Sequence, residues 1–393
     1  MVAVDEVSAP DSAREHERRR LRRRVSESLR TQGFSVEKHR IVPRDSSSKE
    51  AVRKLHADAV AHMRERSRAG LQRREHELLT WIAHGRDLDP HAITPSLVEV
   101  QPKTIEELVF RWVRLHWSIP VSAGYGRRMR FLVLDEANQK LIGILGLSDP
   151  VFALGPRDTA IGWTQRDRRE RLRHVMDAFV LGAVPPYSTL RLGKLVALLA
   201  ASNEVRTAFS RKYRDRTSVI GGRRDSARLA MITTTSALGR SSLYNRLRFE
   251  GETVFRPTGY TAGSGDFQFL NGLYGELRNY ADQYLTATAK HGRWGKGFRN
   301  RRELVRKVLG DIGLSVDWLY HGVQRQVFLV PTARNSEAFL RGEAERLRYW
   351  DRPAHDLFEH FRERWLLPRL RSFDGHQGFS RDSYALWPPE PGA

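Results

Sequence analysis

Apolar side chains recur with helical spacing through the first part of the chain. Leu21, Val25 and Leu29 stand four residues apart inside an arginine-rich run, which predicts a basic helix with one narrow apolar stripe that ends near Gly33. A second helix is expected after the polar segment PRDSSSKE, with apolar positions at Val52, Leu55, Ala59 and Met63. Residues 1–95 are therefore expected to form a basic helical N-terminal unit.

Short apolar runs replace this spacing after residue 125. The segment RMRFLVLDEANQKLIGILGL predicts two strands joined by the turn DEANQ, and AFVLGAVPP predicts a third strand that ends at two prolines. Further along, TLRLGKLVALLAASNEVRTAFSRKY is expected as one long helix, LAMITTTS as a strand, SSLYNRLRF as a helix and EGETVFRP as a strand. Strands that alternate with helices predict an α/β or α+β core with a mixed sheet over residues 96–265.

Helical spacing returns in the remainder of the chain. Residues 266–393 are expected to form a mainly helical C-terminal region, interrupted by one strand, QRQVFLVP. The sequence shows no convincing internal repeat.

Charge narrows the choice of partners. Among the 393 residues, 67 Lys and Arg stand against 46 Asp and Glu, a formal net charge of +21. Such a surplus produces a positive field that attracts polyanions, and nucleic acid, DNA in particular, is the expected partner. An anionic membrane is not expected, since no amphipathic basic anchor or lipidation signal is clear. A GC-rich genome would explain the preference for arginine but not the net excess of cations.

Other features exclude whole classes of chemistry. The chain has no cysteine, which rules out disulfides, thiolate zinc sites and cysteine nucleophiles. No apolar run approaches the roughly 20 residues that span a bilayer, and the N-terminus lacks a secretion signal, so a cytoplasmic protein is expected.

Metal chemistry receives little support from the sequence. His355 and His360 are five residues apart, which places them on different faces of a helix, and no metal site is predicted. A divalent metal held by nuclease-type carboxylates stays open as an alternative, although spacing gives no reason for it. Its candidate ligands are Asp149, Asp158, Asp167 and Asp177.

The run TTTSALGRSS, residues 233–242, holds six hydroxyl side chains between a predicted strand and a predicted helix. One hydroxyl of Ser241 or Ser242 suffices to cap the helix, so the others favour an anion or nucleotide pocket at the helix N-terminus. A third interpretation makes Tyr244 a general acid. The residues expected in the pocket are Thr233, Thr234, Thr235, Ser236, Gly239, Arg240, Ser241, Ser242 and Asn245.

A second arginine-rich segment, RDTAIGWTQRDRRERLRHV, has two interpretations. In the first, Arg157, Trp163 and Arg168 join Arg127 in the same pocket and provide a platform for phosphate and base. In the second, which we prefer, Asp158 caps the loop and pairs with Arg157 while Trp163 fills the core. Asp158 and Tyr244 are the catalytic candidates.

Two basic stretches are candidate nucleic-acid contacts, with solvent-exposed helix or linker as the alternative for each. The first is the N-terminal helix, and the second, HGRWGKGFRNRR, interleaves cations with aromatic side chains that can stack on bases. The candidate residues are Arg18, Arg19, Arg20, Arg22, Arg23, Arg24, Arg293, Trp294, Lys296, Phe298, Arg299, Arg301 and Arg302.

The order of elements in the core resembles the GNAT acetyltransferase superfamily. PYSTLRLGKLVALL stands where that fold has its pyrophosphate-binding turn, with Arg191, Gly193 and Lys194 as the nearest match. LYNRLRFEG stands where it has a later tyrosine and phenylalanine, here Tyr244 and Phe249. The resemblance implies a GNAT-like mixed sheet. A turn that binds pyrophosphate needs small residues, so that its backbone N–H groups can approach the phosphates. Because Gly193 is the only such residue here, acetyl-coenzyme A is not expected to bind, and no cofactor is predicted.

Five segments resemble the DruA family of the Druantia anti-phage system: GYGRRMRFLVL, RDTAIGWTQRDRRERLRHV, TTTSALGRSSLYNRLRFEG, ELVRKVLGDIGLSVDWLYHGVQRQVFLVP and NSEAFLRG. The family's hallmarks fall on the TTTSALGRSS run and on Gly126, Arg127, Arg157, Asp158, Ile161, Gly162, Trp163 and Arg168. The resemblance implies a role in phage defence, with other subunits that include a large helicase-like protein, and it carries no catalytic assignment. Together with the positive charge, it predicts a nucleic-acid-binding component that recognises or processes DNA through a basic cleft on the GNAT-like core. The alternatives are an acyltransferase, a metal-dependent nuclease and a DNA-binding accessory protein of a mobile element.

Overall fold

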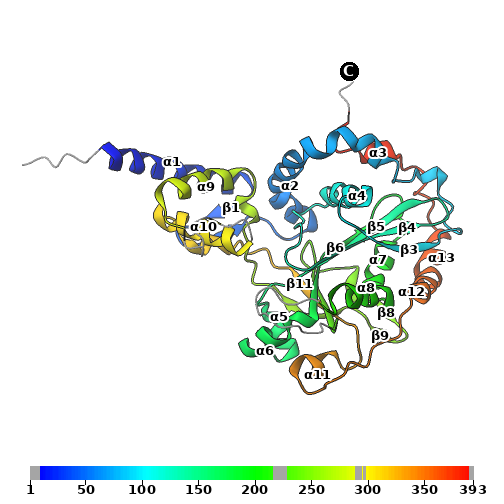
Figure 1. Cartoon of the computed structure of the whole chain (residues 1–393). Helices are drawn as coiled ribbons and strands as arrows, with labels where there is room; N and C mark the ends of the chain where they lie inside the picture. Colours follow the sequence, from blue (N-terminus) through cyan, green and yellow to red (C-terminus); the bar gives the residue numbers. More distant parts are fainter. Residues whose placement is uncertain (1–8, 216–227, 288–293, 295–297, 389–393) are drawn as a thin grey trace, which may run out of the picture. The chain divides into compact units, whose positions relative to one another are not determined.

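A computed structural model of the chain describes residues 9–215, 228–287, 294 and 298–388 (Figure 1). The chain forms two compact units. Unit 1 comprises Met1–Arg66, Ser118–Pro120 and Ala262–Gln324, and unit 2 comprises Ser67–Trp117, Val121–Thr261 and Arg325–Ala393. This grouping differs from the three consecutive parts expected over 1–95, 96–265 and 266–393, because each unit joins segments that are distant in sequence.

Unit 2 is built on one mixed sheet of seven strands, which bears out the prediction of a mixed sheet with helices. The spatial order is β10-β11-β7-β6-β5-β4-β3, and every neighbouring pair is antiparallel except β6 and β7. The strands are β3 (Pro95–Glu99), β4 (Arg128–Asp135), β5 (Lys140–Ser148), β6 (Val175–Ala183), β7 (Met231–Thr235), β10 (Arg256–Tyr260) and β11 (Gln326–Pro331). A separate hairpin is formed by β8 (Arg248–Phe249) and β9 (Glu252–Thr253).

The predicted strands lie close to their expected places. The hairpin β4–β5 turns at DEANQ, and β7 matches LAMITTTS, so these predictions are confirmed. The strand predicted at QRQVFLVP is also present, as β11, but it belongs to the main sheet between β7 and β10. The expected strand EGETVFRP is wrong as one element, since β9 and β10 are separate and pair with different partners.

The parallel pair β6 and β7 is short. It comprises Val175 with Met231, Met176 with Ile232, and Asp177 with Thr233, whereas β6 continues along β5 as far as Ala183. The two strands therefore part after Asp177 and Thr233, and a seam opens inside the sheet. We call this point the β6/β7 seam.

Helices cover both faces of the sheet in unit 2 (Figure 1). Apolar residues of α7, α8 and α12 pack with those of β4, β5 and β6 in one large core, whereas α5 and α11 pack with Val175, Met231 and Leu329 on the other face. These helices and the remaining ones in the unit are α3 (Glu75–Leu79), α4 (Ile105–Val113), α5 (Gly155–Ile161), α6 (Gln165–Arg171), α7 (Gly193–Leu199), α8 (Asn203–Tyr213), α11 (Ser336–Arg341), α12 (Ala354–Phe361) and α13 (Leu367–Leu370).

The long helix expected after β6 is two helices, so that prediction is wrong in its length. Helix α7 ends at Leu199, and α8 begins after Ser202, whose hydroxyl accepts a 3.3 Å hydrogen bond from the amide of Val205. A serine that caps a new helix in this way competes with continuation of the previous one.

Unit 1 contains α1 (Ala9–Thr31), β1 (Phe34–Val36), β2 (Ile41–Pro43), α9 (Leu273–Tyr284), α10 (Phe298–Asp311) and the start of α2 (Lys49–Leu71). The apolar stripe of α1 is confirmed, because Leu21, Val25 and Leu29 are fully buried. The helix ends before Gly33, which adopts a φ of 102° that disfavours other residues. Over the described part of the chain, no helix combines the length and apolar character needed to cross a membrane.

Candidate functional site

Two hydroxyls of the TTTSALGRSS run bridge the β6/β7 seam. The hydroxyl of Thr233 donates to Asp177 Oδ1 at 2.8 Å, and that of Thr234 donates to the carbonyl oxygen of Ala178 at 2.9 Å. Both threonines are buried. Thr235, the last residue of β7, pairs with Val327 of β11. These side chains join strands where the backbone ladder ends, a role that the sequence interpretation did not consider.

The next part of the run forms a polar turn around Gln326. The hydroxyl of Ser236 accepts from the amide of Gln326 at 3.0 Å and donates to the carbonyl of Gly239. The side-chain oxygen of Gln326 accepts from the amide of Ser241 at 3.2 Å and from Asn245 Nδ2 at 2.9 Å. Gln326, which sequence reasoning missed, therefore satisfies a large share of the turn's polar groups.

The helix expected at SSLYNRLRF is absent from this described stretch, where the chain forms only a 3-10 turn at Tyr244–Arg246. Ser241 accepts from the amide of Tyr244 at 3.0 Å, so the predicted capping serine is present without the helix. A turn of three residues lacks the aligned peptide dipoles that attract anions. The part of the anion interpretation that relied on a helix N-terminus is therefore wrong, while Arg240 and Ser242 are exposed.

Tyr244 packs into the core beside this turn. Its ring stacks on Phe255 with centroids 4.9 Å apart and meets Phe328 edge-on at 5.2 Å. Burial raises the pKa of Tyr244 above its ordinary value. A phenol with a raised pKa gives up its proton less readily, which weakens the case for Tyr244 as general acid.

Arg127 fixes the loop that precedes β4. Its guanidinium donates to Asp149 Oδ1 at 2.7 Å and to the carbonyl oxygens of Arg173 and Val175, and its amide donates to Asp149 Oδ2. Gly126 has a φ of 62°, and a Cβ atom there would lie 2.0 Å from Asp149 Oδ2. Only glycine permits this close approach, so the Gly-Arg pair has a structural explanation.

Arg157 and Asp158 hold the loop after β5. Fully buried Arg157 donates to Asp158 at 2.8 Å and to the carbonyl oxygens of Val151 and Phe152 at 2.9 and 3.0 Å. Asp158 also accepts from Arg168 Nη1 at 3.2 Å. These contacts are the ones that the structural interpretation of the segment expects.

Trp163 belongs to the core on the α5 and α11 face of the sheet. Only 7% of the residue is exposed, and its indole nitrogen donates to the carbonyl of Leu340 at 2.8 Å. This environment leaves the ring little surface on which a base can stack.

The loops that Arg127 and Arg157 hold expose an aromatic surface. Seven large apolar side chains are exposed among the described residues, and three of them lie on these loops: Tyr125 (45%), Val151 (38%) and Phe152 (45%). The guanidinium of Arg168 lies over the Phe152 ring, 5.4 Å from its centroid. We call Tyr125, Val151, Phe152 and Arg168 the aromatic rim.

Asp177 lies at the β6/β7 seam, close to the rim. Burial raises the pKa of Asp177 to about 6, against the opposing effects of the Thr233 hydroxyl and the Arg157 charge. Burial and the carboxylates of Asp177 and Asp149 together raise the pKa of Tyr125. A carboxyl group that titrates near neutral pH is thus electrostatically coupled to an exposed phenol. The signal in the sequence was one charged residue inside the apolar strand VMDAFVLGA.

The four carboxylates considered for a nuclease have separate roles. Asp149 pairs with Arg127, Asp158 with Arg157, and Asp177 with Thr233, while Asp167 forms a capping box with Thr164 at the start of α6. Within the residues that the structure describes, no three His, Asp or Glu side chains form a group able to hold a metal ion.

The arginines of α1 mostly have acidic partners inside unit 1. Ion pairs screen the like charges along the helix, which leaves less of its positive field for phosphate. Arg22 lies near Gly313 and has no ion pair among the described contacts. The paired arginines are Arg18, Arg19, Arg20, Arg23 and Arg24, with Glu15, Glu17, Glu27, Glu276 and Asp311 as partners.

The second basic stretch is described only in part. Trp294 is 6% exposed and lies under the Lys307 ammonium, 5.4 Å from its ring centroid, so its ring is not available for stacking on a base. Arg301 donates to Asp266 at 2.8 Å and Arg302 to Ser264 at 3.3 Å. Outside the described residues or side chains lie Arg293, Lys296, Phe298 and Arg299.

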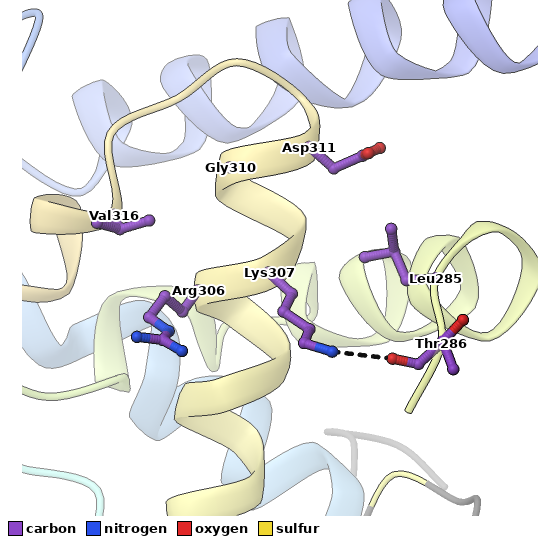
Figure 2. A pocket seen from close by; sticks show the side chains of 7 residues that line it. All are labelled: Leu285, Thr286, Arg306, Lys307, Gly310, Asp311 and Val316. Atoms are coloured by element: carbon purple, nitrogen blue, oxygen red, sulfur yellow. Dashed lines mark hydrogen bonds between the residues drawn. The ribbon is translucent and has the colours of Figure 1, made fainter. Parts of the chain in front are cut away.

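A shallow hollow of about 450 Å³ lies beside α10 in unit 1 (Figure 2). Lys307 Nζ donates across it to the carbonyl of Thr286 at 3.0 Å. Asp311 binds Arg14, Arg18 and Tyr280 instead. The charged groups are largely engaged by the protein, so this hollow is a weaker candidate than the aromatic rim.

The mixed sheet with one short parallel pair, covered by helices on both faces and edged by an aromatic and arginine surface, defines a basic α+β protein. The chain belongs to the Druantia protein DruA family, whose model matches residues 46–342. It is 37% identical over 371 residues to Druantia protein DruA of Escherichia coli (strain UMEA 4076-1), an alignment that covers 94% of this chain and 89% of that protein. No solved structure matches the chain.

Proposed function

We propose that this chain is a nucleic-acid-binding component of a Druantia anti-phage system and that it contacts nucleic acid through the aromatic rim. Membership of the DruA family supports the role in defence. The formal charge of +21 supports a polyanionic partner, for which DNA is the preferred class. We further propose a cytoplasmic location and assembly with other subunits, including a helicase-like protein, as the family resemblance implies.

One observation carries the proposed binding mode: the Arg168 guanidinium lies 5.4 Å from the centroid of the exposed Phe152 ring. An exposed ring gives up contact with water when a base stacks on it, and a guanidinium beside it pairs with the phosphate backbone. Tyr125, which is equally exposed, supplies a second ring near the seam. This combination suits single-stranded nucleic acid, whose bases are accessible.

We propose that the sheet is a GNAT-like scaffold. The support is a central parallel pair, β6 and β7, that parts after three residue pairs, with helix α7 following β6 along the chain. The expected cofactor turn offers no evident cradle for pyrophosphate, because a Cβ atom on Gly193 would lie 3.3 Å from Leu243, and Lys194 lies over the Trp365 ring at 4.9 Å. We therefore propose the scaffold without acetyl-coenzyme A.

Asp177 favours a second candidate function, an enzyme that transfers a proton at the β6/β7 seam. A carboxylate with a pKa of about 6 is able to accept a proton near neutral pH. In this candidate function, Asp177 accepts the proton of a substrate amine. Turnover that Asp177→Asn abolishes while nucleic-acid affinity is kept would favour this function over a binding module.

Binding by the full chain tests the proposed function. Fluorescence anisotropy with single-stranded DNA, duplex DNA and single-stranded RNA should be recorded over a series of KCl concentrations. Phe152→Ala and Tyr125→Ala should each weaken binding about tenfold, since base stacking contributes on the order of 1–3 kcal/mol per ring. Arg168→Gln should reduce the slope of log K against log salt by about one.

Tyr320→Ala is the matched control, because Tyr320 is an equally large ring, 52% exposed, in unit 1. It should leave affinity within twofold of the wild type. Equal affinities for the rim variants and this control, or no salt-sensitive binding to any of the three nucleic acids, would refute the proposed binding mode.

A further inference from the structure

A small pocket between α4 and β4 gathers three arginines. Its volume is about 200 Å³. Along the helix, Glu107, Arg111 and Arg114 recur at three- and four-residue intervals with Phe110, which puts them on one face, and Arg130 of β4 lies opposite. We call this the arginine pocket, and its lining residues are Glu107, Phe110, Arg111, Arg114, Ala123 and Arg130.

Positive charge in the pocket exceeds negative charge. Three guanidinium groups face the one carboxylate of Glu107, which already accepts from Arg130 Nη1 at 2.9 Å and from the amide of Lys103 at 2.9 Å. Burial and the charges of Arg130 and Arg111 lower the pKa of Arg114 to about 10. The arginines therefore repel one another, and the protein supplies too little negative charge to balance them.

The pocket also holds hydrogen-bond donors that the protein does not use. Arg114 Nη1 donates to the carbonyl of Val121 at 3.1 Å, and the Arg130 guanidinium lies over the Phe110 ring, 5.5 Å from its centroid. The Nε atoms of both arginines are buried and lack a partner among the described residues. Buried donors without partners are rare in folded proteins, and an anion that draws the guanidinium groups toward it would relieve both the repulsion and the unmet donors.

We propose that the arginine pocket binds a terminal phosphate group, either free inorganic phosphate or the phosphate of a monoester. Such a group is a dianion near neutral pH, which matches the surplus of two positive charges, and its oxygens accept paired hydrogen bonds from planar guanidinium groups. The ligand is a free phosphate or mononucleotide, or the terminal phosphate of a nucleic-acid strand. The proposal does not rest on nucleic-acid binding at the aromatic rim, because it uses different residues.

Calorimetric titration of the full chain separates these sources. Inorganic phosphate, AMP and two short DNA strands, one with a 5′-phosphate and one with a 5′-hydroxyl, are the probes. Tighter binding of phosphate or AMP identifies the small ligand. A 5′-phosphate strand that binds at least tenfold more tightly than the 5′-hydroxyl strand, and more tightly than AMP, identifies a strand end. No binding by any phosphorylated probe overturns the proposal.

Variants of the pocket residues test whether the phosphate group binds in the arginine pocket. Arg114→Gln and Arg111→Gln should each raise the Kd about tenfold or more, since each removes a charged hydrogen-bond donor. Arg111 is exposed, so its variant keeps the test decisive where Arg114→Gln folds poorly. Glu107→Gln should lower the Kd, because it removes the competing carboxylate and releases Arg130.

Arg166→Gln is the charge-matched control, because Arg166 is an 86% exposed arginine on α6. It should leave the Kd within twofold of the wild type. Equal Kd values for the Arg111, Arg114 and Arg166 variants, or weaker binding by Glu107→Gln, would assign the phosphate to another site and overturn the proposal.

Discussion

Thr233 of β7 donates a 2.8 Å hydrogen bond to the Asp177 carboxylate of β6, at the last residue pair that the two strands share. Beyond this pair, β6 keeps only β5 as a full strand partner. A hydrogen bond between side chains thus connects the two strands at the point where their backbone pairing ends. This relationship places a half-buried, titratable carboxyl where the parallel pairing of β6 and β7 ends.

Asp177 should make the folding stability depend on pH. Its pKa of about 6 in the folded chain exceeds the ordinary value of 3.8, so the folded state holds this proton more tightly than the unfolded state. Its contribution is fully present below about pH 4 and is lost as pH rises through 6, on the order of 3 kcal/mol in all. Asp177→Asn should therefore be more stable than the wild type at pH 7.5, with the difference vanishing near pH 4.

Urea unfolding at several pH values measures this change in the free energy of unfolding. Asp167→Asn is the control, because its effect on stability at neutral pH should have the opposite sign. The Thr164 amide and hydroxyl lower the pKa of Asp167, so its contribution is present at neutral pH and is lost as pH falls. Asp167→Asn should be less stable than the wild type at pH 7.5. Equal stability of Asp177→Asn and the wild type at all pH values would contradict a raised pKa for Asp177.

Gly126→Ala should destabilise the chain more than Gly239→Ala. Both glycines have a positive φ, 62° and 71°, which costs an alanine about 1 kcal/mol. A Cβ atom on Gly126 also clashes with Asp149, whereas one on Gly239 meets nothing within 4 Å. The free energies of unfolding of the two variants, measured by thermal unfolding, should differ by about 1 kcal/mol or more. Similar losses of stability would show that the Asp149 side chain moves away from the added methyl group at no cost in free energy.

Trp163→Ala should lower the stability by about 3–5 kcal/mol, because it removes a large buried side chain. Trp163→Phe should cost only about 1 kcal/mol, since it mainly loses the hydrogen bond to Leu340. Denaturant unfolding and nucleic-acid affinity should be measured together for both variants. A tenfold loss of affinity by Trp163→Phe at unchanged stability would restore the base-platform interpretation.

Gln326→Leu should destabilise the chain by about 1–3 kcal/mol, because Asn245 and the amide of Ser241 then lose their partner. Gln101→Leu, at an exposed position, is the control and should change stability by less than about 0.5 kcal/mol. Chemical denaturation of the two variants gives the comparison. Equal effects would mean that water replaces Gln326 in the turn.

Apolar spacing predicted the elements that bury a regular stripe or face. The hairpin β4–β5 and helix α1 are examples, since their burial follows from period and turn residues alone. The helix expected at SSLYNRLRF failed because Ser241 and Asn245 find a partner in Gln326, which is 81 or more residues away along the chain. Local propensity cannot report such a distant partner.

The candidate sites were predictable only in part. The Gly-Arg pair and the Arg-Asp pair drew notice in the sequence, but the exposure of Tyr125 and Phe152 follows from how Arg127 and Arg157 fold the loops. The arginine pocket was missed because Arg130 stands in a strand, away from its helical partners. Convergence of residues from a helix and a strand depends on tertiary packing rather than on spacing.

The sheet consists of a four-stranded part, β3 to β6, and a three-stranded part, β7, β10 and β11. The three residue pairs of β6 and β7 form the short line along which the two parts join. Backbone amides beside that line have fewer ladder bonds to break than those of β4 and β5, whose strands share eight pairs. Local opening in unit 2 should therefore begin there, and hydrogen exchange should be faster along the edge of β7 that faces β6 than along the long hairpin. Through its hydrogen bond with Thr233, the carboxyl of Asp177 is a mechanical link between the two parts of the sheet.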